Sequence, residues 1–380
     1  SKSLADRGYN VIWWSSDFSH KHKRVRSDCA DKDGFSIRLI KTPAYKKNIS
    51  LSRIRSHLAF SKNFYNEAIN NLKINKLEKP FRIIISLPPL GVAESAFKIK
   101  DYINKLEKKE SHNFKLSPKV TCQVIVDIMD AWPEVFYRVF PKKIKNFIAP
   151  ILLYLFHRSA MTAYKRADKI SAVGESYLEI ARAYLNTQNH IFPSIPKKGN
   201  HKTYDLKKPM HLCYHGVNLK RFDSKIILKR SEKYDKLNKE IKLYHAKNIN
   251  AIYQKNSYLQ IVYIGAMNSG YDLQSVVSAT AKWNNEGSIP IQIHFAGEGE
   301  SLNSLKLRSD KIGLSEIFDN NVQKSKIIFH GNLENEEINK LLHASDIGLV
   351  TNRSNTLVAC PYKAGEYAGA GLPMISCLDG

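Results

Sequence analysis

The segment 359–375, with the sequence ACPYKAGEYAGAGLPMI, combines residue types that suit a phosphorylated ligand. Pro361 predicts the start of a helix, and the free backbone N–H groups at that end can bind phosphate. Lys363 would add a cation there, and Glu366 could accept hydrogen bonds from ribose hydroxyls. Small residues at 368–370 would let a neighbour or a ligand approach closely. The alternative is a packed helix–strand unit with a surface lysine and glutamate.

Two shorter patterns are weaker indications of a site. Gly297-Glu-Gly299 follows a predicted strand, but a lone pair of glycines indicates a tight turn more often than a phosphate site. His20 and His22 lie in the basic run SDFSHKHKR. Histidine is a common metal ligand, yet no third ligand is near in the sequence. We therefore favour a solvated basic loop, and we expect no essential metal ion and no cofactor.

Strand-like runs alternate with amphipathic helical runs, a rhythm typical of parallel sheets covered by helices on both faces. The predicted strands are 11–15, 36–40, 82–86, 122–127, 171–173, 259–265, 290–297, 326–329, 347–350 and 373–377. The predicted helices are 53–72, 91–106, 272–283, 301–311, 334–344 and 362–369, and another begins near Glu175. The predicted fold class is α/β, with two Rossmann-like doubly wound domains.

One interruption of this rhythm divides the chain. Residues 1–222 predict the first domain, with its first strand missing, and residues 259–380 predict the second. Residues 223–258 are rich in Lys, Asn and Tyr and predict a helical linker or insertion. The sequence begins within the end of a helix and stops just after a strand, so we expect truncation at both ends. Tandem domains of this kind usually hold their ligand in the cleft between them.

Charge and cysteine content narrow the class of protein. The formal net charge is +24, from 59 basic and 35 acidic residues. This excess attracts nucleic acid, anionic lipid headgroups or phosphorylated substrates, but no aromatic RNP-like run supports nucleic acid as a partner. The five cysteines are scattered, without a close CxxC pair, which favours reduced thiols in the cytosol.

The segment 136–158 is the main candidate for contact with a membrane. It mixes aromatic and aliphatic residues with clustered lysines. Such a segment can lie in the bilayer interface with its cations on anionic headgroups, or it can be a core helix with a charged start. No apolar run of the sequence approaches the ~18–20 residues that cross a bilayer.

Several segments, in a fixed order, resemble the retaining family-4 (group 1) glycosyltransferases of the GT-B fold, of the bacterial cell-surface polysaccharide type. The donor-site signature of that family is matched by Pro361, Lys363, Glu366, Tyr367, Gly371 and Pro373. Looser matches are 4–11, 127–134 (DIMDAWPE), 172–177 (AVGESY), 215–222 (HGVNLKRF) and 346–350 (DIGLV). The resemblance covers the chain from about Leu4 to Gly380.

The resemblance implies roles for individual residues. Glu366 would bind the ribose of a nucleotide-sugar donor, and Asp130 would face the transferred sugar; these two are the predicted catalytic residues. The predicted donor-binding residues are Gly265, Asn268, Gly270, Gly297, Glu298, Pro361, Lys363, Glu366 and Tyr367. The predicted acceptor-binding residues are Asp127, Trp132, Glu134 and His20.

The sequence also departs from the family pattern. Val358 stands where many members carry a second acid, and Met129 where many carry a histidine. The segment 265–273, GAMNSGYDL, lacks the Arg and Lys that grip the donor diphosphate in many relatives. Backbone N–H groups around Gly265–Gly270 are expected to substitute, because glycine permits close approach of phosphate. A Gly-rich loop of such enzymes would precede Ser1, so we expect this fragment to be inactive.

The sequence therefore favours an enzyme that transfers a hexose or N-acetylhexosamine from a nucleotide-sugar to a lipid-linked or polysaccharide precursor, with retention of configuration. Acceptors of that kind place it in the cytoplasm, peripheral on the inner face of the membrane. Two alternatives stay open. A nucleotide-sugar epimerase can share the two-domain architecture, and a non-enzymatic polyanion binder would fit the charge of +24.

Overall fold

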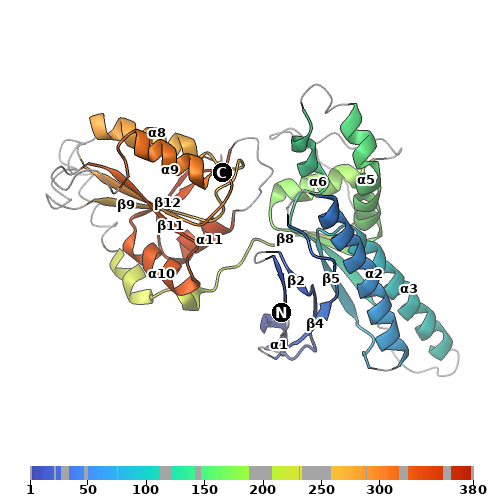
Figure 1. Ribbon diagram of the computed structural model, residues 1–380. Helices are drawn as coiled ribbons and strands as arrows, with labels where there is room; N and C mark the ends of the chain where they lie inside the picture. Colours follow the sequence, from blue (N-terminus) through green and yellow to red (C-terminus); the bar gives the residue numbers. More distant parts are fainter. Residues whose placement is uncertain are drawn as a thin grey trace. The chain divides into compact units, whose positions relative to one another are not determined.

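The structure of the protein is a computed structural model (Figure 1). It describes residues 2–20, 23–26, 34–46, 50–74, 76–111, 121–141, 147–187, 208–230, 232, 258–286, 289–315, 324–353 and 361–377. The chain divides into two compact units, Ser1–Tyr214 and His215–Gly380, which we call unit 1 and unit 2. The division falls before residue 222, the predicted end of the first domain.

Unit 1 contains a parallel four-stranded sheet with the order β5 (Arg82–Leu87), β6 (Gln123–Ile128), β7 (Lys169–Ala172) and β8 (Met210–Leu212). A separate parallel pair joins β1 (Ile12–Ser16) and β4 (Ser36–Ile40). Between these two strands lies a short antiparallel hairpin, β2 (Phe18–Ser19) and β3 (Arg24–Val25). The predicted solvated loop around His20 is therefore a hairpin in which Phe18 is buried, and His22 lies outside the described residues.

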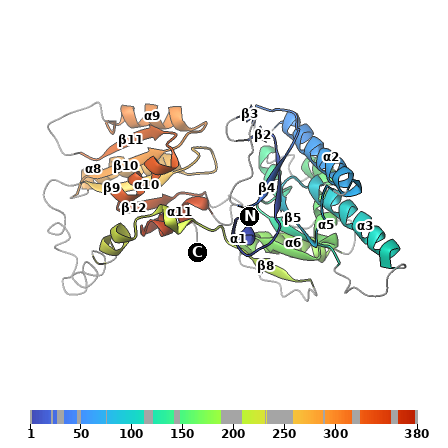
Figure 2. The ribbon, with the colours of Figure 1, turned by 90° about the horizontal axis from the view of Figure 1, so that it is seen from below.

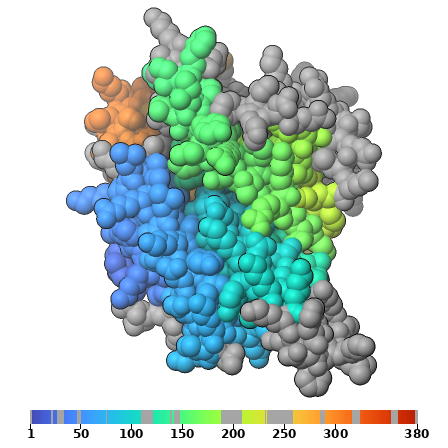
Figure 3. Space-filling view, turned by 90° about the vertical axis from the view of Figure 1, so that its right-hand side faces the viewer, coloured from blue at the N-terminus to red at the C-terminus, as the bar shows by residue number. Residues whose placement is uncertain are grey.

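The helices of unit 1 pack in chain order along its sheets. These are α2 (Leu51–Lys73), α3 (Gly91–Ser111), α5 (Ile148–Arg166) and α6 (Glu175–Leu185), after the short α1 (Lys2–Ala5). Each of the four longer helices contacts the next, and α2, α3 and α5 cover the face seen in Figure 3. Helix α2 begins where the Ser50 side chain accepts a hydrogen bond from Arg53 N, which satisfies a free N–H of its first turn.

Unit 2 holds a five-stranded, all-parallel sheet with the order β11-β10-β9-β12-β13. Its strands are β9 (Leu259–Ile264), β10 (Ile291–Ala296), β11 (Lys326–Gly331), β12 (Ile347–Val350) and β13 (Met374–Ser376). The order runs outward in one direction from β9 to β11 and then in the other from β12 to β13. This is the doubly wound arrangement, and ligands of such sheets bind at the carboxyl ends of the strands, where the direction reverses.

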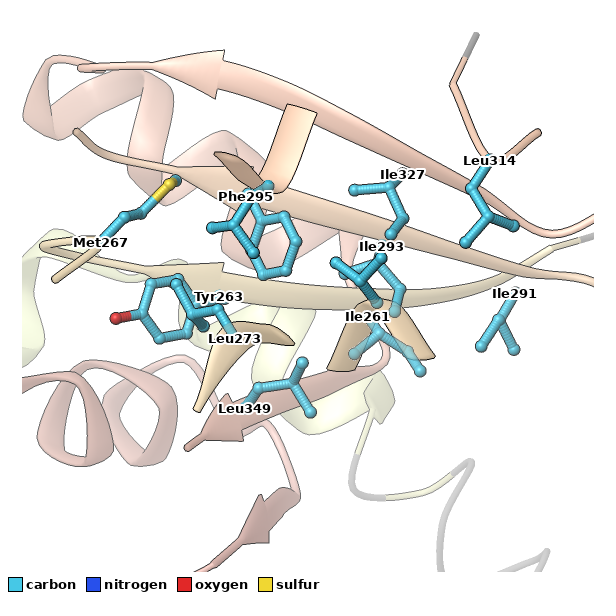
Figure 4. Packing of buried hydrophobic residues seen from close by; sticks show 12 residues of the cluster. Ile261, Tyr263, Met267, Leu273, Ile291, Ile293, Phe295, Leu314, Ile327 and Leu349 are labelled. Carbon is cyan, nitrogen blue, oxygen red and sulfur yellow. The ribbon is translucent and has the colours of Figure 1, made fainter. Parts of the chain in front are cut away.

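Alternate residues of β9 belong to two cores, one on each face of the sheet. Tyr263 packs with Phe295 and with residues of α8 (Leu273–Glu286) and α9 (Leu302–Lys311), as Figure 4 shows for part of that cluster. Val262 packs instead with residues of α10 (Asn335–Ala344) and α11 (Tyr362–Gly369). The two helix pairs therefore cover opposite faces (Figures 1 and 2), and the predicted fold class is confirmed.

Residues 224–230, within the predicted linker, form a helix that packs on unit 2. The Arg230 guanidinium donates to backbone carbonyls of Leu342, His343, Ser345 and Ala370 at 2.6–3.3 Å. These carbonyls lie at the ends of α10 and α11, where a helix lacks internal donors. Most of the remaining linker lies outside the described residues. None of the helices in the described ranges has the length and hydropathy that a bilayer crossing requires.

Candidate nucleotide-sugar site

The reversal point of the unit 2 sheet lies between β9 and β12, and the segments that follow these strands contact each other. Asp272 N donates to Thr351 O at 2.7 Å, and Tyr271 pairs with Asn352 in an isolated antiparallel bridge. Gly265, directly after β9, lies against α11: a Cβ atom built there would lie 3.6 Å from Lys363 Cε. The loop after β9, the segment after β12 and the first turn of α11 thus meet at one edge of the sheet.

Lys363 is buried at this edge between two aromatic rings. Its side chain nitrogen lies 3.9 Å from the ring centroid of Tyr263 and 3.7 Å from that of Tyr271. The residue is 6% exposed, and within the described part of the chain Nζ has no hydrogen-bond partner. Burial lowers its pKa to about 7. An ammonium group held this way gains from the ring faces, but its hydrogen-bond donors stay unsatisfied, which favours an anionic ligand.

Two further buried polar side chains at the end of β12 are also unsatisfied. Asn352 is fully buried, and neither its Oδ1 nor its Nδ2 has a hydrogen-bond partner in the residues that the structure describes. Thr351 is 3% exposed, and its hydroxyl also has no hydrogen-bond partner among the described residues. Leaving such groups unmatched costs about 1–3 kcal/mol each, and in native proteins such groups call for an explanation. A polar ligand that satisfies them would provide one.

Glu366 lies one helical turn after Lys363 and is held by an arginine that the sequence analysis did not select. Arg221 Nη1 donates to Glu366 Oε1 at 2.9 Å. Arg221 Nη2 donates to Asn339 Oδ1 at 3.1 Å, and Asn339 Nδ2 donates back to Arg221 O. The Glu366 side chain remains 19% exposed, and its Oε2 has no hydrogen-bond partner in the described ranges. One carboxylate oxygen is therefore fixed and the other retains its capacity to accept.

The glycines at the strand ends serve close packing of the backbone. Gly297 has φ +140°, and a Cβ atom there would lie 2.0 Å from Gly265 O. Met267 N donates to Glu298 O. The Gly297-Glu-Gly299 segment thus packs against the loop after β9, as the tight-turn interpretation expects.

The backbone N–H groups of the loop 265–270 are largely used within the protein. Gly265 N donates to Ala296 O and Met267 N to Glu298 O. Gly270 N donates to Asn268 Oδ1 at 2.9 Å, and Ser269 N donates to Glu300 Oε1. The expectation that these amides substitute for a diphosphate-binding Arg and Lys finds no support in this geometry. Two cations lie here: Arg353, whose Nη2 is 3.6 Å from Asp272 Oδ1, and Lys363, whose Nζ has no hydrogen-bond partner among the described residues.

Tyr367 and Pro361 build the helix that carries the site. Tyr367 is fully buried, and its hydroxyl accepts a hydrogen bond from Ile264 N at 3.0 Å and lies 3.3 Å from the carbonyl oxygens of Val262 and Leu349. This side chain ties α11 to β9 and β12. Pro361 is the N-cap of α11, as predicted, while Val358 lies outside the described residues.

The predicted acceptor residues of unit 1 separate into two groups. Trp132 is buried, with the His57 ring centroid at 5.2 Å and the Arg53 guanidinium at 5.3 Å from its ring. Asp130, two residues earlier, accepts a hydrogen bond from Ala131 N at 2.9 Å. His20 Nδ1 lies 2.7 Å from Tyr45 Oη. These three residues form the first group, and Asp127 and Glu134 form the second.

Asp127 and Glu134 take part in hydrogen bonds inside unit 1. Asp127 Oδ1 accepts from Ser171 Oγ at 2.6 Å, between β6 and β7. Glu134, which begins a 3₁₀ helix (Glu134–Val139), is 2% exposed and accepts from Tyr184 Oη at 2.7 Å. Burial raises the pKa of Glu134 to about 7. One oxygen of each carboxyl group therefore accepts from a protein hydroxyl, while Glu134 Oε2 has no hydrogen-bond partner among the described residues.

Five residues around this site were not predicted from the sequence, namely Arg221, Tyr263, Tyr271, Thr351 and Asn352. Arg221 lies inside a segment matched to the family, but nothing local shows that its partner is Glu366, 145 residues away. A weak signal existed for Thr351 and Asn352, because polar residues directly after a buried parallel strand are often site residues. Within the described ranges, no three His, Cys, Asp or Glu side chains form a group that could hold a metal ion.

The arrangement of two Rossmann-like units is the fold of the GT-B glycosyltransferases. Three solved structures share it over nearly the whole chain. Sucrose-phosphate synthase from Thermosynechococcus elongatus is similar with a TM-score of 0.56 and 12% identity, over 99% of this chain and 73% of that one. WaaG, a glycosyltransferase involved in lipopolysaccharide biosynthesis, gives 0.51 and 12%, over 98% and 74%. OtsA gives 0.50 and 10%, over 97% and 77%.

These similarities establish the fold, since the identities are low. Neither the comparison with family models nor the comparison with curated proteins finds a match.

Proposed function

We propose that this protein is a glycosyltransferase of the family-4 kind, whose unit 2 binds a nucleotide-sugar donor. The observation that carries the proposal is the buried Lys363 ammonium group, without a hydrogen-bond partner, at the reversal point of a doubly wound sheet. A diphosphate would supply oxygen atoms that accept from this ammonium group and negative charge that balances its positive charge. As the bond to the sugar breaks, charge develops on the leaving diphosphate, and a fixed cation stabilises it.

The neighbouring side chains fit the other parts of such a donor. Glu366, held by Arg221, has a free carboxylate oxygen for a ribose hydroxyl. Asn352 has both a donor and an acceptor for hydroxyl groups of the sugar or for phosphate oxygens. The resemblance in sequence adds the expectation that anomeric configuration is retained. It also supports a hexose or N-acetylhexosamine as the transferred sugar and a polysaccharide or lipid-linked precursor as the acceptor.

A thermal-shift screen of UDP-, GDP- and ADP-sugars tests donor binding, because a ligand of the native state raises the melting temperature. We expect one nucleotide class to raise it, and Lys363→Met and Glu366→Ala to remove the effect. Lys340→Met is the matched control, since Lys340 is an exposed lysine of α10 in the same unit. The proposal is wrong if no nucleotide-sugar shifts the transition, or if Lys363→Met responds like the unchanged protein.

The reaction type requires a second assay with the donor that the screen identifies. Labelled donor is incubated with and without a lipid extract. A glycosyltransferase moves the labelled sugar from the nucleotide to a lipid of the organic phase only when the extract is present. An epimerase instead converts the donor to an isomer in the absence of any acceptor. Isomerisation of the donor alone would replace the proposed transferase by the epimerase.

We also propose that unit 1 rests on an anionic membrane surface through the first half of α5. Four large apolar side chains of this helix are 61–78% exposed, namely Phe147 just before it and Ile151, Leu152 and Leu155 within it. The opposite side of α5 is buried through Leu153 and Ala160. Lysines at 142, 143 and 145 precede the exposed side chains in sequence. An apolar surface that follows a lysine-rich segment in sequence suits insertion into an anionic interface. The membrane face that we propose is the cytoplasmic one, as the resemblance in sequence implies.

Flotation with vesicles tests this surface. We expect Ile151→Glu and Leu155→Glu to reduce binding to vesicles that contain phosphatidylglycerol, because each places a charge among acyl chains. Leu58→Glu is the matched control, since Leu58 is a leucine of α2 that is 63% exposed. Equal loss in all three variants, or no loss in the two α5 variants, would contradict the proposed membrane contact.

A further inference from the structure

A cluster of basic and aromatic side chains belongs to unit 1, whereas Lys363 belongs to unit 2. Its members come from segments that are distant in sequence, the β2–β3 hairpin, the segment after β4, the first two turns of α2 and the turn after β6. They are His20, Lys23, Tyr45, Arg53, His57 and Trp132, and we call them the basic cluster. The fold brings four basic side chains together here. A high net charge by itself would not bring them together, because like charges repel.

The hairpin side of the cluster is built around Tyr45, which is 8% exposed. His20 Nδ1 lies 2.7 Å from Tyr45 Oη. Lys23 Nζ lies 3.4 Å from the same His20 nitrogen and 4.6 Å from the centroid of the Tyr45 ring. The lysine and histidine are therefore held over one aromatic side chain, rather than spread into solvent.

The helix side of the cluster is built around Trp132, which is 4% exposed. Arg53 and His57 are one turn apart on α2, and both contact the indole ring. Trp132 N donates to Asp130 O at 2.9 Å, so the predicted catalytic Asp130 lies in the same turn. A ligand in the basic cluster would thus be close to the residue expected to face the transferred sugar.

The basic groups repel one another electrostatically. Burial and the charges of Lys23 and Arg53 lower the pKa of His20. Burial, Arg53 and His20 lower the pKa of His57 to about 4. For His20 and His57, no acid among the described residues raises the pKa. The amino-terminal end of α2 adds its own positive potential. An arrangement of this kind is stabilised when an anion with more than one charge binds.

We propose that the basic cluster binds a phosphate or diphosphate group. Arginine and lysine are the side chains that bind phosphate oxygens most strongly. We assign this phosphate group to the acceptor of the transferred sugar, where it would lie close to Asp130. This assignment rests on the proposed function. The group belongs either to a soluble phosphorylated acceptor or to a lipid headgroup, and both offer the same oxygens.

Titration calorimetry with pyrophosphate tests the site. All variants are made in a Lys363→Met background, so that pyrophosphate bound in unit 2 does not contribute. We expect Arg53→Gln to weaken binding about tenfold or more, the scale of a lost charge-assisted hydrogen bond. Arg55→Gln is the matched control, since Arg55 is an exposed arginine of the same helical turn and removes the same charge. It should weaken binding less than about twofold.

Each outcome decides the proposal. Equal weakening by Arg53→Gln and Arg55→Gln would show that only the general positive charge attracts pyrophosphate, and would overturn it, as would the absence of binding to the folded protein. Circular dichroism checks folding. If Arg53→Gln does not fold, Lys23→Gln in the surface hairpin takes its place, with Arg26→Gln as its control.

Two further measurements identify the source and separate this inference from the proposed function. If pyrophosphate is displaced by a soluble sugar phosphate, the acceptor is soluble. If it is displaced only by phosphatidylglycerol vesicles, and not by phosphatidylcholine vesicles, the group is a lipid headgroup. Donor binding is measured with Lys363 intact. If the protein binds nucleotide-sugars but Arg53→Gln does not weaken pyrophosphate binding, only the proposal for the basic cluster is refuted. If Arg53→Gln weakens pyrophosphate binding but no nucleotide-sugar binds, only the donor site is refuted.

Discussion

Arg221 donates to Glu366 across 145 residues of sequence, at 2.9 Å. The contact joins the 3₁₀ turn Leu219–Arg221 (η2) to the helix that follows the donor-site Lys363. Because Asn339 holds both the side chain and the carbonyl of Arg221, the arginine is fixed before it meets the carboxylate. Glu366 is therefore oriented by the fold and does not depend on a ligand for its position.

If Arg221 positions Glu366, then Arg221→Lys should weaken donor binding about fivefold to tenfold, since lysine cannot bond to Glu366 and Asn339 in the same geometry. Glu366→Gln should have a similar effect. The double variant should lose less than the sum of the two, because both changes break one contact. Calorimetry with the identified donor gives these values, with Lys220→Gln as the control. Additive losses would mean that the two residues act independently.

Lys363 should make stability depend on pH. Its pKa is about 7 in the folded protein and near 10.4 in an unfolded chain. Between these values the unfolded state binds more protons, so the free energy of unfolding rises with pH across that interval. Lys363→Met should be more stable than the unchanged protein at pH 6, by a few kcal/mol at most, and the difference should vanish near pH 10. Urea denaturation at both pH values measures it, and identical differences at both would refute the burial cost.

Asn352 should matter to the ligand and not to the free protein. Asn352→Leu has nearly the same shape and removes polar atoms that lack partners, so stability should be unchanged or slightly higher. Donor affinity should fall about tenfold, as hydrogen bonds to the ligand are lost. Thr280→Val is the comparison, since that hydroxyl bonds to Val276 O and its loss should lower stability only. A variant of Asn352 that is destabilised but binds normally would contradict the assignment.

Glu134 should produce the opposite pH dependence in unit 1. Burial raises its pKa from 4.5 to about 7. Between those values the folded state binds more protons, so the contribution of this group to stability is present below pH 4.5 and is lost as pH rises to about 7. Glu134→Gln should remove about 2–3 kcal/mol of this pH-dependent change. Glu94 is an exposed acid of α3, so Glu94→Gln should retain the pH-dependent change in stability. An unchanged pH dependence in Glu134→Gln would show that the Glu134 carboxyl group does not titrate in this range.

The helices and strands of this protein were predictable because the hydrophobic periodicity of each segment is visible in its own sequence. Residues 36–40, 347–350 and 362–369 form the predicted strands and helix with the predicted ends. Pro361 marked the start of α11, and spacing and residue type led to the prediction of Lys363 and Glu366 as site residues. Local patterns suffice where a strand alternates in burial, or where a helix begins at a residue that favours that position.

Partners across the sequence could not be predicted in the same way. Glu134 was selected as a ligand group, but its actual partner, Tyr184, lies 50 residues away. Tyr263 and Tyr271 look like core residues in the sequence, and only the folded chain shows that their rings enclose Lys363. Whether a polar side chain faces a ligand or another protein group depends on contacts between distant segments, which periodicity does not record.

The most direct measurement is a titration of the Lys363 amino group by NMR, with selectively labelled lysine and Lys363→Met for assignment, in the free protein and with saturating nucleotide-sugar. In a nucleotide-sugar the diphosphate is esterified at both ends and does not itself titrate near neutral pH. We predict a pKa of about 7 in the free protein and a value higher by at least about one pH unit in the complex, because the diphosphate favours the charged amine. An unchanged pKa in the saturated complex would contradict the central claim that the donor diphosphate binds at Lys363.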